Sequence, residues 1–210
     1  MRKALNLICV LAMTAGVLSC KKDPDPQAQL PSYLRVPATL TGYAGSGLIT
    51  VAGGGLNLRA EGPEQLNTTT NTYSGVLGQI STGDINAYFT VGQPRIYKES
   101  SQVPNDYQAN GALAIINTVS PGTYPMNAQA PSPRGEFADL VLKLPGPQIY
   151  NTQGGSLIIS ESTLIKTQGT ANLYRVQGTF QATLNGSGIG TIPGKPIDVS
   201  GTFDLLFVQN

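Results

Sequence analysis

The stretch LYRVQGTFQATL at residues 173–184 constrains the fold of this chain more than any other. Apolar residues or glycines occupy every second position, and polar residues occupy most of the positions between them. Side chains alternate between the two faces of a β-strand, whereas a helix repeats about every 3.6 residues. The segment therefore predicts a strand with one buried face. That face comprises Tyr174, Val176, Gly178, Phe180, Ala182 and Leu184.

A second stretch of the same design, IDVSGTFDLLF at residues 197–207, follows a glycine-rich loop. The two stretches share a short motif, VQGTF in the first and VSGTF in the second. We expect them to pair antiparallel, so that each aromatic ring covers the backbone that an opposite glycine leaves bare. A slip of one residue would turn every apolar side chain outward. The predicted register sets three pairs opposite each other: Leu184 with Ile197, Gly178 with Phe203, and Phe180 with Gly201.

Shorter alternating segments precede these two, and turn residues separate them. DINAYFTV places Ile85, Ala87, Phe89 and Val91 on one face, and FADLVLKL does the same for Ala138, Leu140, Leu142 and Leu144. Further expected strands are SLIISESTLI, SGLITV, GLNLRA and, more weakly, ATLTGY at residues 38–43. No helical pattern follows residue 20. The sequence therefore predicts one all-β domain over residues 33–210, an antiparallel β-sandwich with a β-barrel as the alternative.

The alternating pattern loosens between residues 92 and 134, where six prolines interrupt it. Proline cannot donate to a central ladder, so long loops or edge strands are expected here. The same region holds Tyr97, Tyr107 and Tyr124. Long loops are uncommon unless they are functional, and aromatic faces stack on sugar rings. These three tyrosines are therefore the predicted ligand contacts.

The first nineteen residues have the parts of a bacterial export signal. Arg2 and Lys3 supply a positive start, and a mostly apolar run follows from residue 5 to residue 18. A helix of that length is shorter than the hydrocarbon core of about 30 Å that a permanent span must cross. We therefore expect residues 1–19 to be a cleaved signal peptide.

The end of that run, Val17-Leu18-Ser19-Cys20, resembles the lipobox of bacterial lipoproteins. The resemblance implies cleavage between Ser19 and Cys20 and a diacylglycerol on the cysteine sulfur. The only other cysteine, Cys9, lies in the segment that would be removed, which leaves no disulfide partner. The alternative is an ordinary secretory signal with a leftover free cysteine.

Residues 20–32 read as a tether. Charged residues and three prolines cannot build a core, and proline favours an extended backbone with a reach of about 35 Å. The charged residues directly after Cys20 are similar to those of surface lipoproteins of Bacteroidota. This resemblance implies an outer-membrane protein, anchored by its lipid at the cell surface or on the periplasmic face.

Composition limits the chemistry. The formal net charge is +1, which gives no electrostatic basis for binding nucleic acid. The chain contains no histidine, so His-based nucleophile pairs and the commonest zinc ligand are missing. We expect no cofactor, no metal and no catalytic residue. Among carboxylates that lie in or beside strands, Glu136, Asp139 and Glu161 would be the candidates for a two-carboxylate hydrolase.

The segment SPGTYP at residues 120–125 and the two late GTF strands resemble functionally uncharacterised, β-rich surface lipoproteins of Bacteroidota. The resemblance implies an envelope module and assigns a role to Cys20 alone. The expected function is a non-catalytic, lipid-anchored binding module for a glycan or protein ligand. A structural or adhesive envelope component is the alternative, and a carboxylate-based glycan-active enzyme is the least favoured reading.

Overall fold

The computed structural model describes residues 30–70, 72–81, 83–94, 109–127, 135–144, 149–187 and 195–209. These residues form eleven β-strands and one short 3-10 turn, η2 (Ser32–Leu34). None of them forms a helix with the length and apolar character needed to cross a bilayer. The strands are β1 (Ser46–Gly53), β2 (Leu56–Gly62), β3 (Gln65–Asn67), β4 (Thr72–Ser81), β5 (Asp84–Pro94), β6 (Ala109–Ile116), β7 (Gly122–Pro125), β8 (Phe137–Lys143), β9 (Ile149–Gln168), β10 (Ala171–Ser187) and β11 (Ile197–Gln209).

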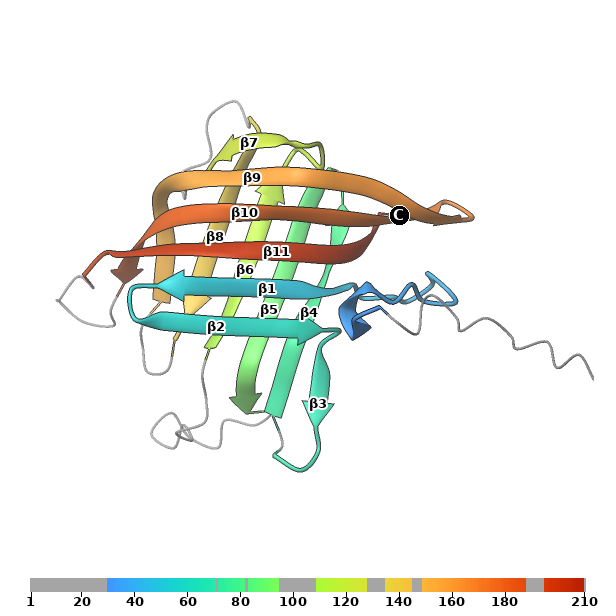
Figure 1. The fold of residues 1–210 in the computed structure, drawn as a ribbon, viewed down its shortest axis with the longest axis horizontal. Coiled ribbons are helices and arrows are strands. Elements are labelled where there is room, and N and C mark those ends of the chain that lie inside the picture. Colours follow the sequence, from blue (N-terminus) through green and yellow to red (C-terminus); the bar gives the residue numbers. More distant parts are fainter. Residues whose placement is uncertain are drawn as a thin grey trace, which may run out of the picture.

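One continuous sheet contains all eleven strands and folds over on itself. Its order is β2-β1-β11-β10-β9-β8-β6-β5-β4-β3, and β7 adds to β9. In Figure 1 the strands β9, β10, β11, β1 and β2 form a front layer, and β8, β6, β5 and β4 cross behind them. The all-β, antiparallel prediction is confirmed. The two layers face each other as in a sandwich, but because they belong to one sheet the architecture is the predicted alternative, a nearly closed barrel.

Strand β9 joins the two layers. Its first residues pair with β8, and its whole length pairs with β10. Three register shifts interrupt the β9–β10 ladder, and they leave Gln153, Ser160 and Ile165 without a partner across the ladder. Such bulges bend a strand and increase its twist. They therefore let one strand of 20 residues curve from the back layer into the front layer.

The barrel closes along the outer edge of β4. Four alternate residues of this strand meet three different segments: Ser74 and Val76 meet Gln65 and Pro63 of the stretch after β2, Gly78 meets Ala44, and Ile80 meets Gln209. The amide of Gly78 donates to the carbonyl of Ala44 at 2.7 Å. Gly78 has a φ of 154°, and a Cβ there would collide with the carbonyl oxygen of Asn86. Along this edge of β4, which we call the barrel seam, short contacts with separate segments thus take the place of one continuous neighbouring strand.

The predicted register of the last two strands is confirmed. Leu184 pairs with Ile197, Gly178 with Phe203, and Phe180 with Gly201. A Cβ on either glycine would collide with the ring of its partner, so the rings do cover bare backbone. A third pair of this kind, Phe89 with Gly111, joins β5 to β6.

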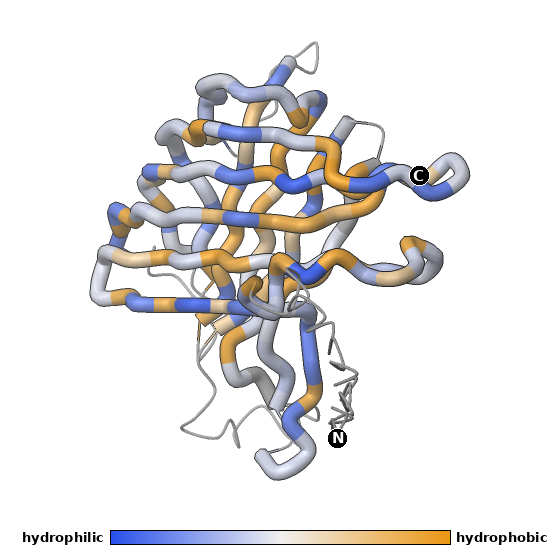
Figure 2. The backbone as a smooth tube through the Cα atoms, turned by 45° about the vertical axis from the view of Figure 1, so that its right-hand side comes forward, coloured by the Kyte–Doolittle hydropathy of each residue, from blue (hydrophilic) through white to orange (hydrophobic). Residues whose placement is uncertain are grey.

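The core lies between the two layers. Phe180, Phe203 and Phe207 are almost fully buried there, together with apolar residues from the back layer. Figure 2 shows apolar and polar residues alternating along the strands that enclose this core. The predicted inward faces of residues 85–91 and 138–144 contribute Phe89 and Leu140 to it. Burial of one face per layer is what holds the sheet closed.

A smaller apolar cluster lies on the outside of the front layer. The segment before β1 packs Leu40 against Leu173, Leu206 and Val208, which point away from the main core. The ATLTGY segment at residues 38–43 was expected to be a weak strand, but it forms no strand in the structure. It covers these outward side chains as an irregular segment, with a turn at Thr41 and Gly42.

The expectation for residues 92–134 is wrong in part. Residues 109–116 form β6, a central strand between β5 and β8 with Leu113 and Ile115 fully buried. Small residues weaken its alternating signal, because Gly111, Ala112 and Ala114 provide little apolar contrast. The edge strand β7 fits the prediction. Strands β3 and β4 were not predicted at all.

Candidate functional site

The most exposed aromatic side chain of the described residues is Tyr88, at the middle of β5. Its neighbours Ala87 and Phe89 are buried, with Phe89 in the main core, so strand alternation turns the Tyr88 ring to the outer face of the back layer. Tyr88 is 52% exposed. A large aromatic that faces solvent from a central strand is a candidate platform for a ligand.

Beside Tyr88 the outer face is hollowed into a trough of about 360 Å³. The neighbouring strands place small or medium residues in the same row, Ala112 on β6 and Val141 on β8. Strands lie about 4.8 Å apart, so this apolar row extends about 10 Å from the tyrosine across two strands. The trough thus has an apolar floor with an aromatic ring at one end.

A second, polar row runs next to the apolar one. It contains Thr90, Asn110 and Lys143, which lie opposite one another on β5, β6 and β8, and it ends at Ile149 on β9. Glu64, from the corner between β2 and β3, also lines the trough, and its carboxylate accepts a hydrogen bond from the Thr90 hydroxyl. We call the hollow lined by these residues, with Tyr88, Ala112 and Val141, the Tyr88 trough.

This arrangement suits an amphipathic ring. A pyranose has apolar faces made of C–H groups and hydroxyls around its edge. The apolar row offers a surface for such a face, and the polar row offers amide, hydroxyl and charged groups at its side. The carboxylate of Glu64 and the ammonium of Lys143 balance in formal charge. The trough therefore has the chemistry to hold an uncharged sugar.

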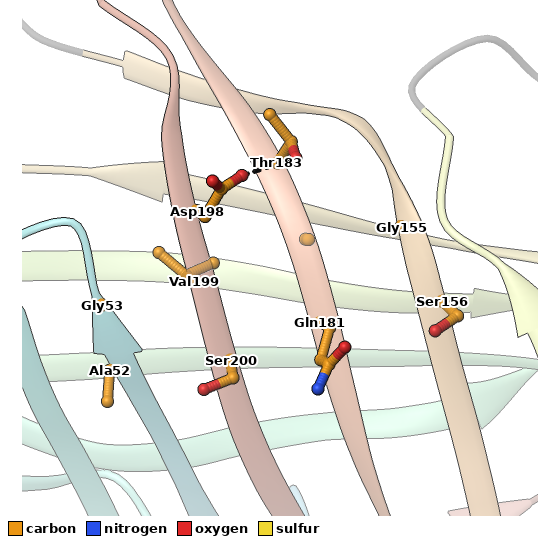
Figure 3. Close-up of a pocket in the computed structure, with 10 residues that line it drawn as sticks. Ala52, Gly53, Gly155, Ser156, Gln181, Thr183, Asp198, Val199 and Ser200 are labelled. Atoms are coloured by element: carbon orange, nitrogen blue, oxygen red, sulfur yellow. Dashed lines mark hydrogen bonds between the residues drawn. The ribbon is translucent and has the colours of Figure 1, made fainter.

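A larger but shallower hollow of about 450 Å³ lies on the outer face of the front layer (Figure 3). Small polar side chains such as Ser156, Gln181 and Ser200 line it. Nearby hydroxyls already bond to other side chains: Thr183 donates to Asp198 at 2.7 Å, and Thr50 lies 2.8 Å from Thr202. No aromatic side chain lines this hollow, so it offers no stacking surface.

Of the three tyrosines predicted to contact a ligand, the structure describes one. Tyr97 and Tyr107 lie outside the described residues, as do Ser19 and Cys20. Tyr124 on β7 is only 6% exposed, and its hydroxyl donates to the carbonyl of Ser120 at 2.7 Å. It packs into the core and closes the turn before its own strand. The structure thus shows structural contacts for Tyr124, and its role as a ligand contact stays a prediction.

The structure places the candidate carboxylates Asp139 and Glu161 in different layers. Asp139 lies on β8 in the back layer, and Glu161 lies on the part of β9 that pairs with β10 in the front layer. Glu161 accepts a hydrogen bond from Thr163 at 2.8 Å, and Glu136 is exposed just before β8. Among the described residues, no group of three or more acidic or cysteine side chains could hold a metal ion.

Sequence reasoning did not single out Tyr88, although it placed the residue correctly between the inward-facing Ala87 and Phe89. The available signal was the position itself, since a tyrosine on the polar side of an alternating strand must face outward. No known protein-family model, curated protein or solved structure matches this chain. Function is therefore inferred from the residues of the chain itself.

Proposed function

We propose that the protein is a non-catalytic, lipid-anchored protein of the bacterial outer membrane that binds an uncharged glycan in the Tyr88 trough. The resemblance of Val17-Leu18-Ser19-Cys20 to a lipobox supports the anchor. The exposed ring of Tyr88 beside a polar row is the single observation that carries glycan binding.

The proposed complex places one sugar ring on Tyr88 and its hydroxyls toward Asn110, Thr90 and Glu64. Stacking supplies affinity because it removes apolar surface from water, and hydrogen bonds to the polar row supply orientation. The trough is open to solvent on the outer face of the back layer, so a longer sugar chain can extend from it. These features favour an oligosaccharide or polysaccharide over a single small sugar.

A glycan array probed with the protein tests this proposal. Tyr88→Ala should lower the affinity for the bound glycan about ten-fold or more, because the stacking surface is lost. Tyr88→Phe should retain most of the binding, because the ring remains. Thr179→Ala, on the exposed outer face of the front layer, is the matched control and should bind like the parent protein.

Other results would favour the alternatives. No glycan retention combined with co-purification of a large envelope assembly would favour a structural or adhesive component. Hydrolysis of a polysaccharide that is abolished by Glu136→Gln would favour an enzyme.

A further inference from the structure

Two large apolar side chains are exposed side by side near the tip of the β9–β10 hairpin. Leu164 is 51% exposed and Ile165 is 41% exposed. Adjacent residues of a regular strand face opposite ways, but here Leu164 pairs with Tyr174 and Lys166 with Leu173, so Ile165 is the extra residue of a bulge. This hairpin extends beyond the rest of the barrel (Figure 1).

The N-terminal segment is held against the same hairpin. The Lys166 ammonium donates to the carbonyl oxygens of Pro37 and Ala38 at 2.9 and 2.8 Å. The amide of Leu40 donates to the side-chain oxygen of Gln168 at 2.7 Å. The chain toward Cys20 therefore leaves the barrel at the end that carries Leu164 and Ile165.

Within the two segments that meet at the exposed pair the charged side chains are cationic, while the carboxylates of Asp204 and Glu61 lie near Tyr33 on η2. Residues 30–45 and 163–173 contain two cationic residues, Arg35 and Lys166, and no Asp or Glu. Exposed apolar side chains beside cations are typical of surfaces that rest on anionic lipid headgroups.

The length of the tether agrees with this geometry. Leu30 lies ten positions after Cys20, and a fully extended chain over that interval spans at most about 36 Å. If Cys20 carries the lipid, Leu30 must lie within that distance of the membrane. The hairpin holds residues 37–40, a few positions further along the chain, and is then kept near the lipid surface at a high effective concentration.

We propose that this end of the barrel contacts an anionic lipid surface, with Leu164 and Ile165 inserted among the headgroups. The proposal rests on the lipid anchor at Cys20 and is independent of glycan binding. Its consequence is a fixed orientation, in which the β1–β2 turn at the opposite end of the front layer points away from the membrane (Figure 1).

The test uses the lipidated full-length protein in phosphatidylglycerol vesicles. A cysteine introduced by Leu164→Cys is labelled with a polarity-sensitive fluorophore, and brominated lipids serve as depth-resolved quenchers. The sulfur of a lipidated Cys20 does not react, so the label reports only the new position. The exposed Asn57 lies just after the β1–β2 turn, and Asn57→Cys is the matched control.

We expect the label at position 164 to be quenched from about 5–10 Å below the headgroup level, and the label at position 57 to remain unquenched. Equal quenching at both positions, or none at position 164, overturns the proposed contact. A blue shift at position 164 without quenching by lipid indicates a second copy of the chain at this surface and also overturns it. The intact mass of the protein shows which premise has failed when position 164 is not quenched. If the diacylglycerol mass is present, only the proposed contact is overturned; if it is missing, the lipid anchor at Cys20 is overturned as well.

Discussion

The ring of Phe180 covers Gly201 on the neighbouring strand, so that a methyl group at position 201 would lie 2.6 Å from Cε1 of the ring. It would lie still closer to the carbonyl oxygen of Thr50 on the other side. The mirror-image pair, Phe203 over Gly178, is adjacent in the same ladder. Glycine and aromatic ring thus exchange positions between β10 and β11, and the two rings fill the centre of the core.

We predict that Gly201→Ala lowers the free energy of unfolding by about 2–3 kcal/mol, because backbone and ring must both move to admit the methyl group. Urea denaturation followed by circular dichroism measures this. Gly154→Ala is the matched control, since a Cβ there meets nothing within 4 Å. Equal losses for the two variants would show that the close approach of Phe180 does not matter.

The ion pair of Arg175 and Asp204 gives a second prediction. The guanidinium donates two hydrogen bonds to the carboxylate, at 2.9 and 2.8 Å, and the two side chains are 30% and 13% exposed. This hydrogen bond is the main cause that raises the pKa of Arg175 above its ordinary value. Asp204→Ala should lower the free energy of unfolding by about 1–3 kcal/mol, since it leaves a partly buried charge without its partner.

A double variant provides the control for that pair. Arg175→Met combined with Asp204→Leu removes both charges and should recover most of the loss in the same urea experiment. If the double variant loses as much as the two single changes added together, the residues do not stabilise the fold as a pair.

Alkaline pH should destabilise the fold through Tyr33. Burial, followed by the nearby Asp204 carboxylate, raises the pKa of this phenol above its ordinary 10.0. Below pH 10 the phenol is protonated in both states and contributes no pH dependence. Above it the unfolded chain loses the proton first, so the free energy of unfolding falls as pH rises toward the pKa of the folded state. Tyr33→Phe should make this fall shallower, and an unchanged slope would refute the assignment.

Substitutions at Tyr124 and Tyr88 should have separate effects, one on the free energy of unfolding and the other on glycan affinity. Tyr124→Phe should lower the free energy of unfolding by about 1 kcal/mol, because the carbonyl of Ser120 loses its hydrogen bond, and glycan binding should not change. Tyr88→Ala should lower binding and leave stability within about 0.5 kcal/mol, because its ring is solvent-facing. Thermal melts and affinity measurements on both variants check this, and a reversed outcome would restore Tyr124 as the ligand contact.

The late strands were predictable because their alternation is long and their glycines and aromatics are complementary. The observed register buries Val176, Phe180, Phe203 and Leu205 together and sets each glycine opposite an aromatic ring. Strand β6 was not predictable in this way. Its small residues carry a weak pattern, and Phe89 and Leu142 on the neighbouring strands provide the burial that fixes it in the sheet.

The barrel seam and the Tyr88 trough depend on contacts between distant segments. No local pattern places Pro63 beside Val76, or Gln209 beside Ile80. The trough also needs three strands in register, because Tyr88, Ala112 and Val141 share a row only after β5, β6 and β8 have paired. An outward tyrosine could be read from the sequence, but its neighbours could not.

Amide chemical-shift mapping on isotope-labelled protein, titrated with the best glycan from the array, tests the central claim most directly. The account predicts that the largest shift changes fall on Tyr88, Asn110, Ala112 and Val141, on the outer face of the back layer. Changes centred instead on Thr179, Gln181 and Ser200 would move the site to the front layer and contradict the account.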